Sequence, residues 1–407
     1  MHSHDLVFSR SNLEFSPALD DRRSSALAHA NSLGMPTRRL EAWHYTDLRQ
    51  LMRGKLDENF SSIDGQSDVS SKVAISSPYH IHFTGTEVIV SQALINSGAV
   101  TVSSILESHD YLLALDESDA MPAYNMALLN GGCDIHVSAS LEEPIAMYYS
   151  GGQHTRHKLT LSEGVFLQLF EVMSASQYVN LVVDTNLSAH AHLQHTVLHS
   201  SGDVVSLNRV SLGADAQFDK HIVCASNSVA RHDVETAIQG QGARARLNGV
   251  VISDARAHID LTSAIRHQAG NTTSATLVRS VVADTGRAVF QGKICVDRDA
   301  QKVEAVQNSN ALLLSEQASM SAKPELEIYA DDVACAHGST IGEIDRDALF
   351  FLRSRGIPED EAIALLLEGF LSEVVAEVDN DDIRLCVNGF ISDRLSQLDV
   401  SQINFEE

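Results

Sequence analysis

The sequence predicts a mainly β protein with a helical segment at each end. Short β-branched segments begin near Tyr79 and follow one another without interruption after Pro144. Turn signals such as Gly240-Gln-Gly242 and Asp284-Thr-Gly286 recur at intervals close to one strand plus one turn. No helical pattern separates these strands, which argues against a βαβ architecture. A sandwich and a solenoid both fit, and the regular spacing with small residues at turns favours a stacked β-helix.

The amino-terminal part shows a helical pattern. Ser16 is a suitable N-cap, Pro17 suits the first turn, and Gly34 ends the apolar periodicity. A second helical segment follows, and we expect its Trp43, the only tryptophan, to anchor it against the rest of the chain. Residues 57–72 are rich in Ser, Asp and Gly, which predicts a linker or a long loop.

The carboxyl-terminal part predicts three helices. Asp345 can cap the first, Pro358 precedes the second, and residues 379–382 separate the second from the third. Their apolar residues form broad stripes, which include Leu349, Phe350, Ile363, Leu366, Leu367 and Phe370. Such stripes either pack within the domain or bind a partner, and the pattern leaves both alternatives open.

Composition restricts the classes of partner. The formal net charge of −25 argues against binding to nucleic acid or to an anionic membrane. The five cysteines are far apart and include no Cys-x-x-Cys, which favours a reducing compartment over a disulfide framework. No segment reaches a membrane-spanning length and the amino terminus lacks the features of a signal peptide, so we expect a cytoplasmic protein.

Cys335 and His337 are the strongest candidates for chemistry. In an extended strand, residues two apart share a face, so both side chains point the same way. A thiolate and an imidazole on one face can bind a metal or act as nucleophile and base. Two ligands do not complete a zinc or iron–sulfur site, so the others must come from elsewhere, for example from another chain. The alternative is a buried cysteine beside a hydrogen-bonded histidine.

Other clusters carry weaker signals. On a continuous strand His190 and His192 share one face while His195 and His199 share the other, so we expect solvated positions rather than a metal site. We expect the same of His154 and His157. The chain has no P-loop motif, no H-E-x-x-H and no G-x-S-x-G. No evidence for an enzymatic function comes from these motifs.

Several motifs together resemble one family. The run from Leu326 to Val333 followed by Cys335-Ala-His337-Gly resembles the hallmark of the SufB/SufD family of iron–sulfur cluster assembly scaffolds. Similar segments are residues 345–351 and 354–357, Gly292-Lys-Ile294, residues 308–315, and Glu41-Ala-Trp-His-Tyr-Thr46. Within the family, the Cys335-Ala-His337-Gly run and the element at Glu41 favour the SufD branch, and a SufB-like paralogue is the alternative.

The resemblance implies an architecture and a role. It implies a right-handed parallel β-helix over residues 73–344, between an N-terminal helical domain with linker (1–72) and a C-terminal helical domain (345–407). It further implies a non-catalytic scaffold that works with a SufB-like paralogue and is driven by the ATPase SufC. The six stripe residues, Leu349 to Phe370, would then contact SufC.

The resemblance also implies a site. His337, and in second place Cys335, would bind iron or a nascent cluster at the interface with SufB, while Asp331 and Asp332 orient His337. A homodimer in isolation, an indirect link to a cysteine desulfurase system and a flavin in the complex are compatible with the family.

Two rival functions come from other classes. A polysaccharide-acting β-helix enzyme would need a groove of acids, bases and aromatic residues, but aromatic residues make up only 5% of the chain. A purely structural solenoid would leave Cys335 and His337 dispensable.

Overall fold

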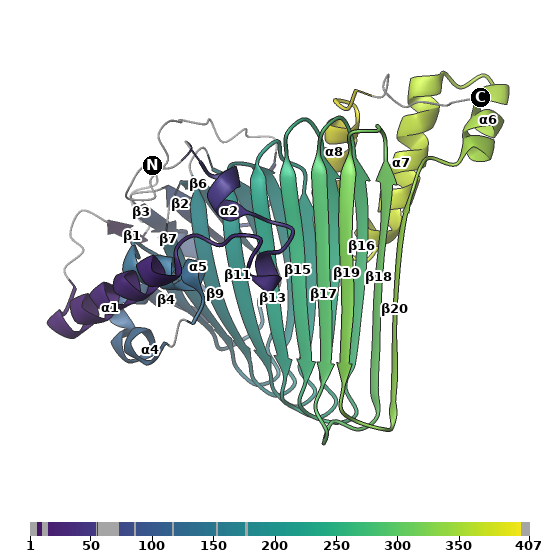
Figure 1. The fold of residues 1–407 in the computed structure, drawn as a ribbon. Coiled ribbons are helices and arrows are strands. Elements are labelled where there is room, and N and C mark those ends of the chain that lie inside the picture. The colour runs from purple at the N-terminus through teal and green to yellow at the C-terminus, as the bar shows by residue number, and fades with distance from the viewer. Residues whose placement is uncertain are drawn as a thin grey trace.

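Two long sheets face each other in the computed structural model, which describes residues 6–9, 15–53, 55, 73–84, 87–115, 118–151, 154–175 and 178–399 (Figure 1). The parallel strands of the eleven-stranded sheet are β6 (Ile145–Gly151), β8 (Phe166–Ser174), β10 (His192–Ser201), β12 (Gln217–Cys224), β14 (Arg244–Ser253), β16 (Thr273–Val282), β18 (Val303–Leu313) and β20 (Val333–Gly342). Those of the nine-stranded sheet are β5 (Cys133–Val137), β7 (His154–Leu161), β9 (Val179–Leu187), β11 (Val204–Leu212), β13 (Val229–Ile238), β15 (His258–His267), β17 (Arg287–Val296) and β19 (Ser319–Ile328).

The chain alternates between the two sheets, so each coil adds one strand to each of them. His192 lies beside Gln217, Gln217 beside Arg244, and Arg244 beside Thr273, all in parallel register. This connection confirms the predicted parallel β-helix and excludes the sandwich.

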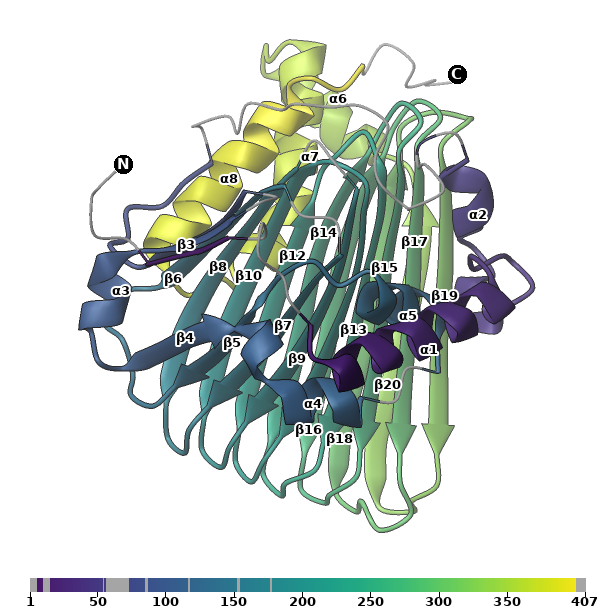
Figure 2. The same cartoon turned by 90° about the vertical axis from the view of Figure 1, so that its left-hand side faces the viewer.

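The turns at one end of the strands repeat from coil to coil, as Figure 2 shows along the lower edge. Gly164, His190, Asp215, Gly242, Asn271 and Lys302 occupy this turn, and all have φ between 49° and 75°. The backbone N–H of His190 donates to the carbonyl of Ala214, and that of Asp215 to Gln241. His190 is therefore a left-handed turn residue bonded to the next coil.

The interior between the sheets is mostly apolar. Alternate side chains along each strand point inward, such as Leu193, Phe218 and Leu247, all of which are buried. Burying each large aliphatic side chain contributes about 1.5–3 kcal/mol, so the stacked coils stabilise one another.

Antiparallel strands and helices close the amino-terminal end of the solenoid. β1 (Leu6–Ser9) pairs with β3 (Glu87–Val90), β3 with β2 (His80–Thr84), and β4 (Val100–Ser104) with β5, all antiparallel. β2 joins this cap to the solenoid by parallel pairing with β6. Leu94 of α3 (Gln92–Asn96) is fully buried in the interior core. The short elements η3 (Ile105–Glu107), α4 (His109–Ala114) and α5 (Ala120–Ala127) follow.

The first helix forms as predicted. α1 (Pro17–Leu33) begins after Ser16, whose hydroxyl accepts from the Leu19 N–H, and ends at Gly34 with φ 69°. The second segment differs from the prediction, since it forms only the short pieces η2 (Glu41–Trp43) and α2 (Leu48–Leu51). Trp43 is buried with the Arg231 guanidinium 4.2 Å from its ring centre, which confirms its anchoring role. The predicted linker, residues 57–72, lies outside the described residues.

Three helices form the carboxyl-terminal part: α7 (Glu359–Val375) and α8 (Asp381–Leu395) lie along the eleven-stranded sheet (Figure 2), and α6 (Arg346–Ser354) packs against α7. Asp345 caps α6 as predicted, and its carboxylate accepts from the N–H groups of Asp347 and Ala348. β20 ends at Gly342 and α6 begins at Arg346. The domain boundaries at residues 72 and 344 remain predictions.

One local prediction is wrong. The two glycines Gly338 and Gly342, which follow the Cys335-Ala-His337 run, predict a turn, but both lie in β20, where they continue the ladder with β18. Ladder pairing of Gly338 with Asn308 keeps the segment extended.

Candidate functional site

The last coil of the solenoid, formed by β19 and β20, is uncovered. Neither strand contains a buried residue, whereas five residues of the preceding β18 are buried. β20 ends one sheet and β19 ends the other, and no described element lies beyond them (Figure 1). Their interior side chains are half-buried or exposed, and the backbone groups of their outer edges have no partner strand among the described residues. We call this surface the open end.

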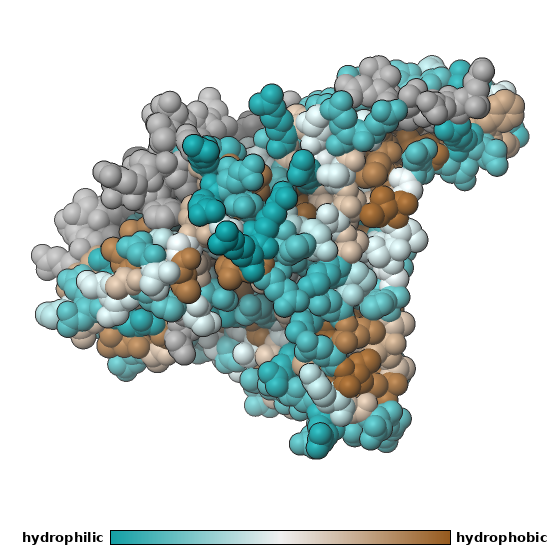
Figure 3. All heavy atoms as spheres, in the orientation of Figure 1, coloured by the Kyte–Doolittle hydropathy of each residue, from teal (hydrophilic) through white to brown (hydrophobic). Residues whose placement is uncertain are grey.

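Apolar side chains gather at the open end. Exposed large residues there are Ile328, Tyr329 and Ile341, with exposed fractions between 40% and 60%. Figure 3 shows apolar surface along the edge where β19 and β20 lie. An exposed apolar patch at an unpaired sheet edge is typical of an interaction surface.

Cys335 and His337 lie on this edge and share the inward face of β20. Cys335 pairs with Ala305, and His337 with Gln307, in the parallel ladder between β18 and β20. Ala305 and Gln307 are both buried inside the solenoid, which fixes the direction of the β20 side chains. The prediction that the two residues share a face is confirmed.

The two side chains differ in exposure. Cys335 is half-buried and packs with the cluster that contains Ala305 and Leu326. Burial raises the pKa of its thiol, although a backbone hydrogen bond with Ala305 partly opposes the shift. His337 is exposed. A bound cation would favour the Cys335 thiolate.

The two acids before β20 belong to a turn. Asp331 and Asp332 are exposed, the N–H of Asp332 donates to Gln301 Oε1, and its carbonyl accepts from the N–H of Lys302. Among the described residues no third His, Cys, Asp or Glu completes a metal site with Cys335 and His337. The open end therefore offers two adjacent ligands and an incomplete coordination sphere.

Polar residues continue from His337 into the solenoid. The same inward column holds Gln307, Thr276, Leu247, Lys220 and His195, counted inward from β18 to β10. Gln307 spans the interior, and its Nε2 donates to the carbonyl of Gly292 at 3.1 Å. A Cβ at Gly292 would lie 2.2 Å from Gln307 Oε1, so glycine makes room for this contact.

A buried ionic network of Glu171, His195 and Lys220 lies deeper in the solenoid. His195 Nε2 is 2.8 Å from Glu171 Oε2, and Lys220 Nζ donates to His195 Nδ1 at 2.9 Å. Burial would raise the pKa of Glu171, but the hydrogen bond from His195 and the charge of Lys220 outweigh it and hold the pKa at about 2. Burial lowers the pKa of His195 to about 4, so a neutral imidazole joins a carboxylate to an ammonium group.

The other predicted histidines are mostly buried. His195 and His199 share the inward face as expected, but both are buried, so the expectation of solvated positions is wrong for them. His192 is half-buried, and its Nε2 lies 2.7 Å from Asp219 Oδ2. His154 and His157 are buried too. Buried imidazoles are retained because partners in neighbouring coils satisfy them, as Tyr149 does for His157 at 2.8 Å.

Sequence reasoning missed the partners of His199. Cys224 of β12 and His232 of β13, both from the following coil of the solenoid, lie against its imidazole ring. The signal lies in the ladder pairing of His199 with Cys224, which residue spacing alone does not reveal.

The apolar stripes of the C-terminal helices mainly hold these helices on the sheet. Leu349, Ile363 and Leu367 are buried in a core shared with the outer face of the eleven-stranded sheet, and Leu366 and Phe370 pack against it. Phe350 is 74% exposed. Exposed apolar residues that sequence reasoning did not select are Phe351, Leu365 and Leu385. The prediction that the stripe binds a partner is therefore restricted to its exposed residues, such as Phe350.

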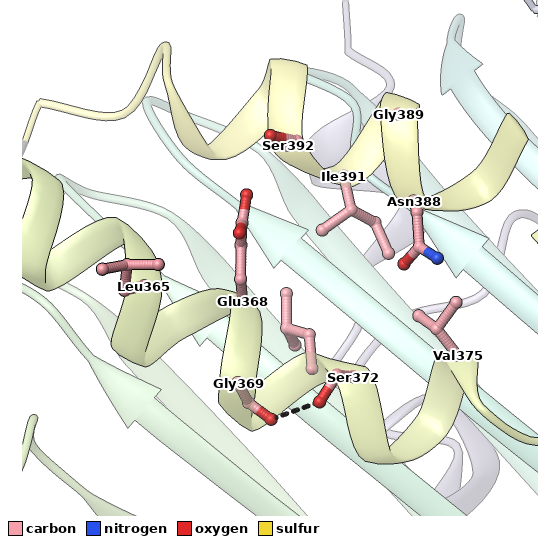
Figure 4. A pocket seen from close by; sticks show the side chains of 10 residues that line it. Leu365, Glu368, Gly369, Ser372, Val375, Asn388, Gly389, Ile391 and Ser392 are labelled. Atoms are coloured by element: carbon pink, nitrogen blue, oxygen red, sulfur yellow. Dashed lines mark hydrogen bonds between the residues drawn. The ribbon is translucent and has the colours of Figure 1, made fainter. Parts of the chain in front are cut away.

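A groove runs between α7 and α8. It has a volume of about 550 Å³, and Leu365, Glu368, Ser372, Asn388 and Ser392 are among the residues that line it (Figure 4). Gly369 and Gly389 also border the groove, and the Ser372 hydroxyl donates to the carbonyl of Gly369.

The described residues contain no helix long and apolar enough to cross a membrane.

These features define a class of protein: a parallel β-solenoid with one closed end, one open end that bears a cysteine and a histidine, and a helical C-terminal layer. Comparison with known proteins defines the family. Residues 146–370, more than half of the chain, match the family model described as the SufBD core domain of SUF system FeS cluster assembly. The chain belongs to the SufB/SufD family.

Curated relatives point to the SufD branch. The iron-sulfur cluster assembly protein SufD of Escherichia coli (strain K12) is 29% identical over 394 residues, which cover 92% of this chain and 93% of that protein. SufD of Bacillus subtilis (strain 168) is 24% identical over 395 residues, with 88% and 90% covered. The SufBD family protein slr0076 of Synechocystis is 30% identical over about half of each chain. The chain is SufD-like, and its family acts in iron–sulfur cluster assembly.

Proposed function

We propose that this chain is a non-catalytic scaffold subunit whose open end pairs with a paralogous SufB-like solenoid and holds a nascent iron–sulfur cluster between them. The observation that carries this proposal is the uncovered last coil with Cys335 and His337 side by side on β20. Cys335 and His337 would provide two ligands, and the partner would provide the thiolate or carboxylate ligands that the described part of this chain lacks.

Pairing through the open end has a physical basis. The edges of β19 and β20 present unpaired N–H and C=O groups, which a strand of another chain can satisfy. The apolar residues Ile328, Tyr329 and Ile341 would be covered in the same event. Without the paralogue, a second copy of this chain can occupy the same surface, as expected for a homodimer in isolation.

The proposal assigns energy supply to another subunit. This chain has no P-loop, so ATP hydrolysis would take place in a SufC-like ATPase that docks on the C-terminal helices. Phe350, Phe351 and Leu385, with exposed fractions of 74%, 55% and 73%, support a docking surface on α6 and α8. ATP-driven movement of the ATPase would reach the solenoid through α7, which packs directly on the sheet.

Anaerobic purification of the tagged chain from its native lysate tests the proposal. We expect a P-loop ATPase and a paralogous solenoid chain to copurify, together with iron and sulfide. His337→Ala should retain both partners but lose the iron and sulfide, because it removes a ligand without disturbing the interior. The control is His136→Ala, which removes an exposed histidine from β5 near the closed end. Unchanged iron and sulfide in the His337 variant would refute the site.

The docking surface is tested separately. Phe350→Asp should lose the ATPase from the purified complex, since it places a charge on an exposed apolar site of α6. Leu33→Asp changes an equally apolar, 48% exposed residue of α1 and should keep the ATPase. Equal recovery of the ATPase with both variants would contradict docking at α6.

A further inference from the structure

A second group of histidine and cysteine side chains lies inside the solenoid. His199 is near the end of β10, Cys224 ends β12, and His232 lies in β13 of the opposite sheet. Their exposed fractions are 0%, 1% and 3%. His199 Nδ1 is 3.1 Å from His232 Nε2 and 3.4 Å from Cys224 Sγ. One potential ligand atom from each of the three side chains lies within 4.8 Å of the other two.

Neighbouring groups orient the His199 ring. Its Nε2 lies 2.9 Å from the carbonyl oxygen of Gly202. A carbonyl only accepts, so Nε2 carries the proton and Nδ1 directs a lone pair at Cys224 and His232. Ser228 also donates to this carbonyl, at 2.7 Å, and holds it in place.

His232 is supported in a similar way. Its Nδ1 is 2.9 Å from Ser206 Oγ, and the Ser206 hydroxyl lies 3.5 Å from the carbonyl of Arg231. When Ser206 donates to that carbonyl, its oxygen accepts from Nδ1–H, and His232 Nε2 also directs a lone pair at His199 Nδ1. In the other tautomer His232 Nε2–H donates to His199 Nδ1, so the arrangement with two facing lone pairs is the one that a bound cation would select. Histidine ligands of metals typically have their second nitrogen held by such a partner.

We propose that His199, Cys224 and His232 form a buried three-ligand site for a single divalent transition-metal ion that accepts nitrogen and sulfur ligands, Zn²⁺ before Fe²⁺. Two imidazoles and one thiolate match the three-protein-ligand sets that bind zinc. Zn²⁺ comes first because sites of this kind bind it more tightly than Fe²⁺. The fourth position is open to a water molecule or another small ligand.

Binding changes the protonation of the cysteine. Burial raises the pKa of the Cys224 thiol to about 12, so the metal-free site holds S–H. On binding, the S–H bond breaks, a sulfur–metal bond forms and the proton passes to solvent. One thiolate and one divalent ion leave a net charge of +1, which the imidazoles do not change.

The buried site is separate from the open end. Cys224 lies in β12, and β14, β16 and β18 lie between it and β20, so four strand steps separate Cys224 from Cys335. At about 4.8 Å per step, β12 and β20 lie about 19 Å apart across the sheet. Along the strands, Cys224 is in register with Ile341, six residues beyond Cys335, so the two cysteines are farther apart still. The inference does not depend on the proposed function, because the three ligands all belong to this chain.

Cobalt binding tests the site. The experiment uses the full chain with Cys335→Ala and His337→Ala, so that the open end contributes no ligand, after removal of metals with a chelator. Co²⁺ is then added, and visible absorption is recorded. We expect one Co²⁺ per chain, a sulfur-to-cobalt charge-transfer band, and displacement of both by Zn²⁺.

Matched variants identify the ligands. Cys224→Ser should abolish the charge-transfer band, whereas Cys133→Ser, at another buried cysteine of the same interior, should keep it. Ser206→Ala should weaken binding about 10-fold to 100-fold through loss of support for His232. Ser211→Ala, on the outward face of the same strand, should leave the affinity unchanged.

X-ray absorption of the Zn²⁺-loaded chain keeps the test decisive if Cys224→Ser does not fold. A shell of one sulfur and two imidazole ligands supports the site. Absence of stoichiometric Co²⁺ binding, a charge-transfer band that survives Cys224→Ser, or a shell without sulfur would overturn it.

Discussion

The same sheet presents cysteine and histidine in two settings. In β10 and β12, His199 and Cys224 are buried between the sheets and meet His232 from the opposite sheet. In β20, Cys335 and His337 face the same interior direction, but no further coil covers them. The difference is the next coil: in the middle of the solenoid it supplies the missing partners, and at the open end the proposed function assigns them to another chain.

The contrast distinguishes residues whose main effect is on stability from residues whose main effect is on binding. Polar groups in covered coils need internal partners, since an unpartnered buried group costs about 1–3 kcal/mol, and more when charged. Groups at the open end remain solvated, so their replacement changes binding and leaves the fold intact. The predictions below compare the two settings, from the largest expected effect on stability to the smallest.

Acid should destabilise the chain through its covered coils. Burial lowers the pKa of His157 and of His195 to about 4, below the ordinary value of 6.5. Between these values the unfolded chain binds protons that the folded chain does not, so stability is present above about pH 6.5 and is lost as the pH falls towards 4. One pKa unit corresponds to about 1.4 kcal/mol, so the two groups together contribute several kcal/mol.

Urea unfolding at a series of pH values measures this loss. The exposed His337 lies at the open end, so His337→Ala should show the same pH dependence as the unsubstituted chain. A free energy of unfolding that stays constant across the window would contradict the assignment of neutral, buried histidines.

Removal of one charged residue from the buried ionic network should lower the free energy of unfolding by about 3–5 kcal/mol. Glu171→Ala leaves the Lys220 ammonium buried without its counter-charge, since His195 is neutral. Glu171→Ala combined with Lys220→Met should recover part of the loss, because no buried charge remains. His337→Ala should change the free energy of unfolding by less than about 0.5 kcal/mol. Equal losses for Glu171→Ala and His337→Ala in denaturant unfolding would remove the distinction between the two settings.

Two glycines provide a smaller comparison. Gly292→Ala should cost about 1–3 kcal/mol, because the new Cβ would lie 2.2 Å from Gln307 Oε1 in a covered coil. Gly342→Ala at the open end meets no atom within 4 Å and should be neutral. Thermal unfolding of both variants provides the measurement, and a stable Gly292 variant would show that Gln307 can move aside.

Sequence patterns predicted local structure and one site well. The caps at Ser16 and Asp345 depend on neighbouring residues, and the shared face of Cys335 and His337 follows from the period of a strand. All three need information from only a few residues, which the sequence supplies directly.

Contacts between coils could not be predicted, because coil length varies. His192 pairs with Gln217, 25 residues later (217 − 192), but Thr273 pairs with Glu304, 31 residues later (304 − 273). Without this register, the strand period shows that His199 faces inward or outward with His195, but not that it meets Cys224 and His232. The same limit applied to the stripes of α7, whose contact with the sheet surface became visible only in the fold.

Hydrogen–deuterium exchange of the β20 amides tests the central claim that the open end is an interface. In the monomeric chain, studied at a concentration low enough to dissociate any homodimer, the amides of β20 that do not bond to β18 face solvent and should exchange quickly. In the complex recovered anaerobically from the native lysate, these amides should become protected, while those of the turns at residues 190 and 215 should not change. Unchanged exchange in β19 and β20, with protection elsewhere in the solenoid, would contradict the account.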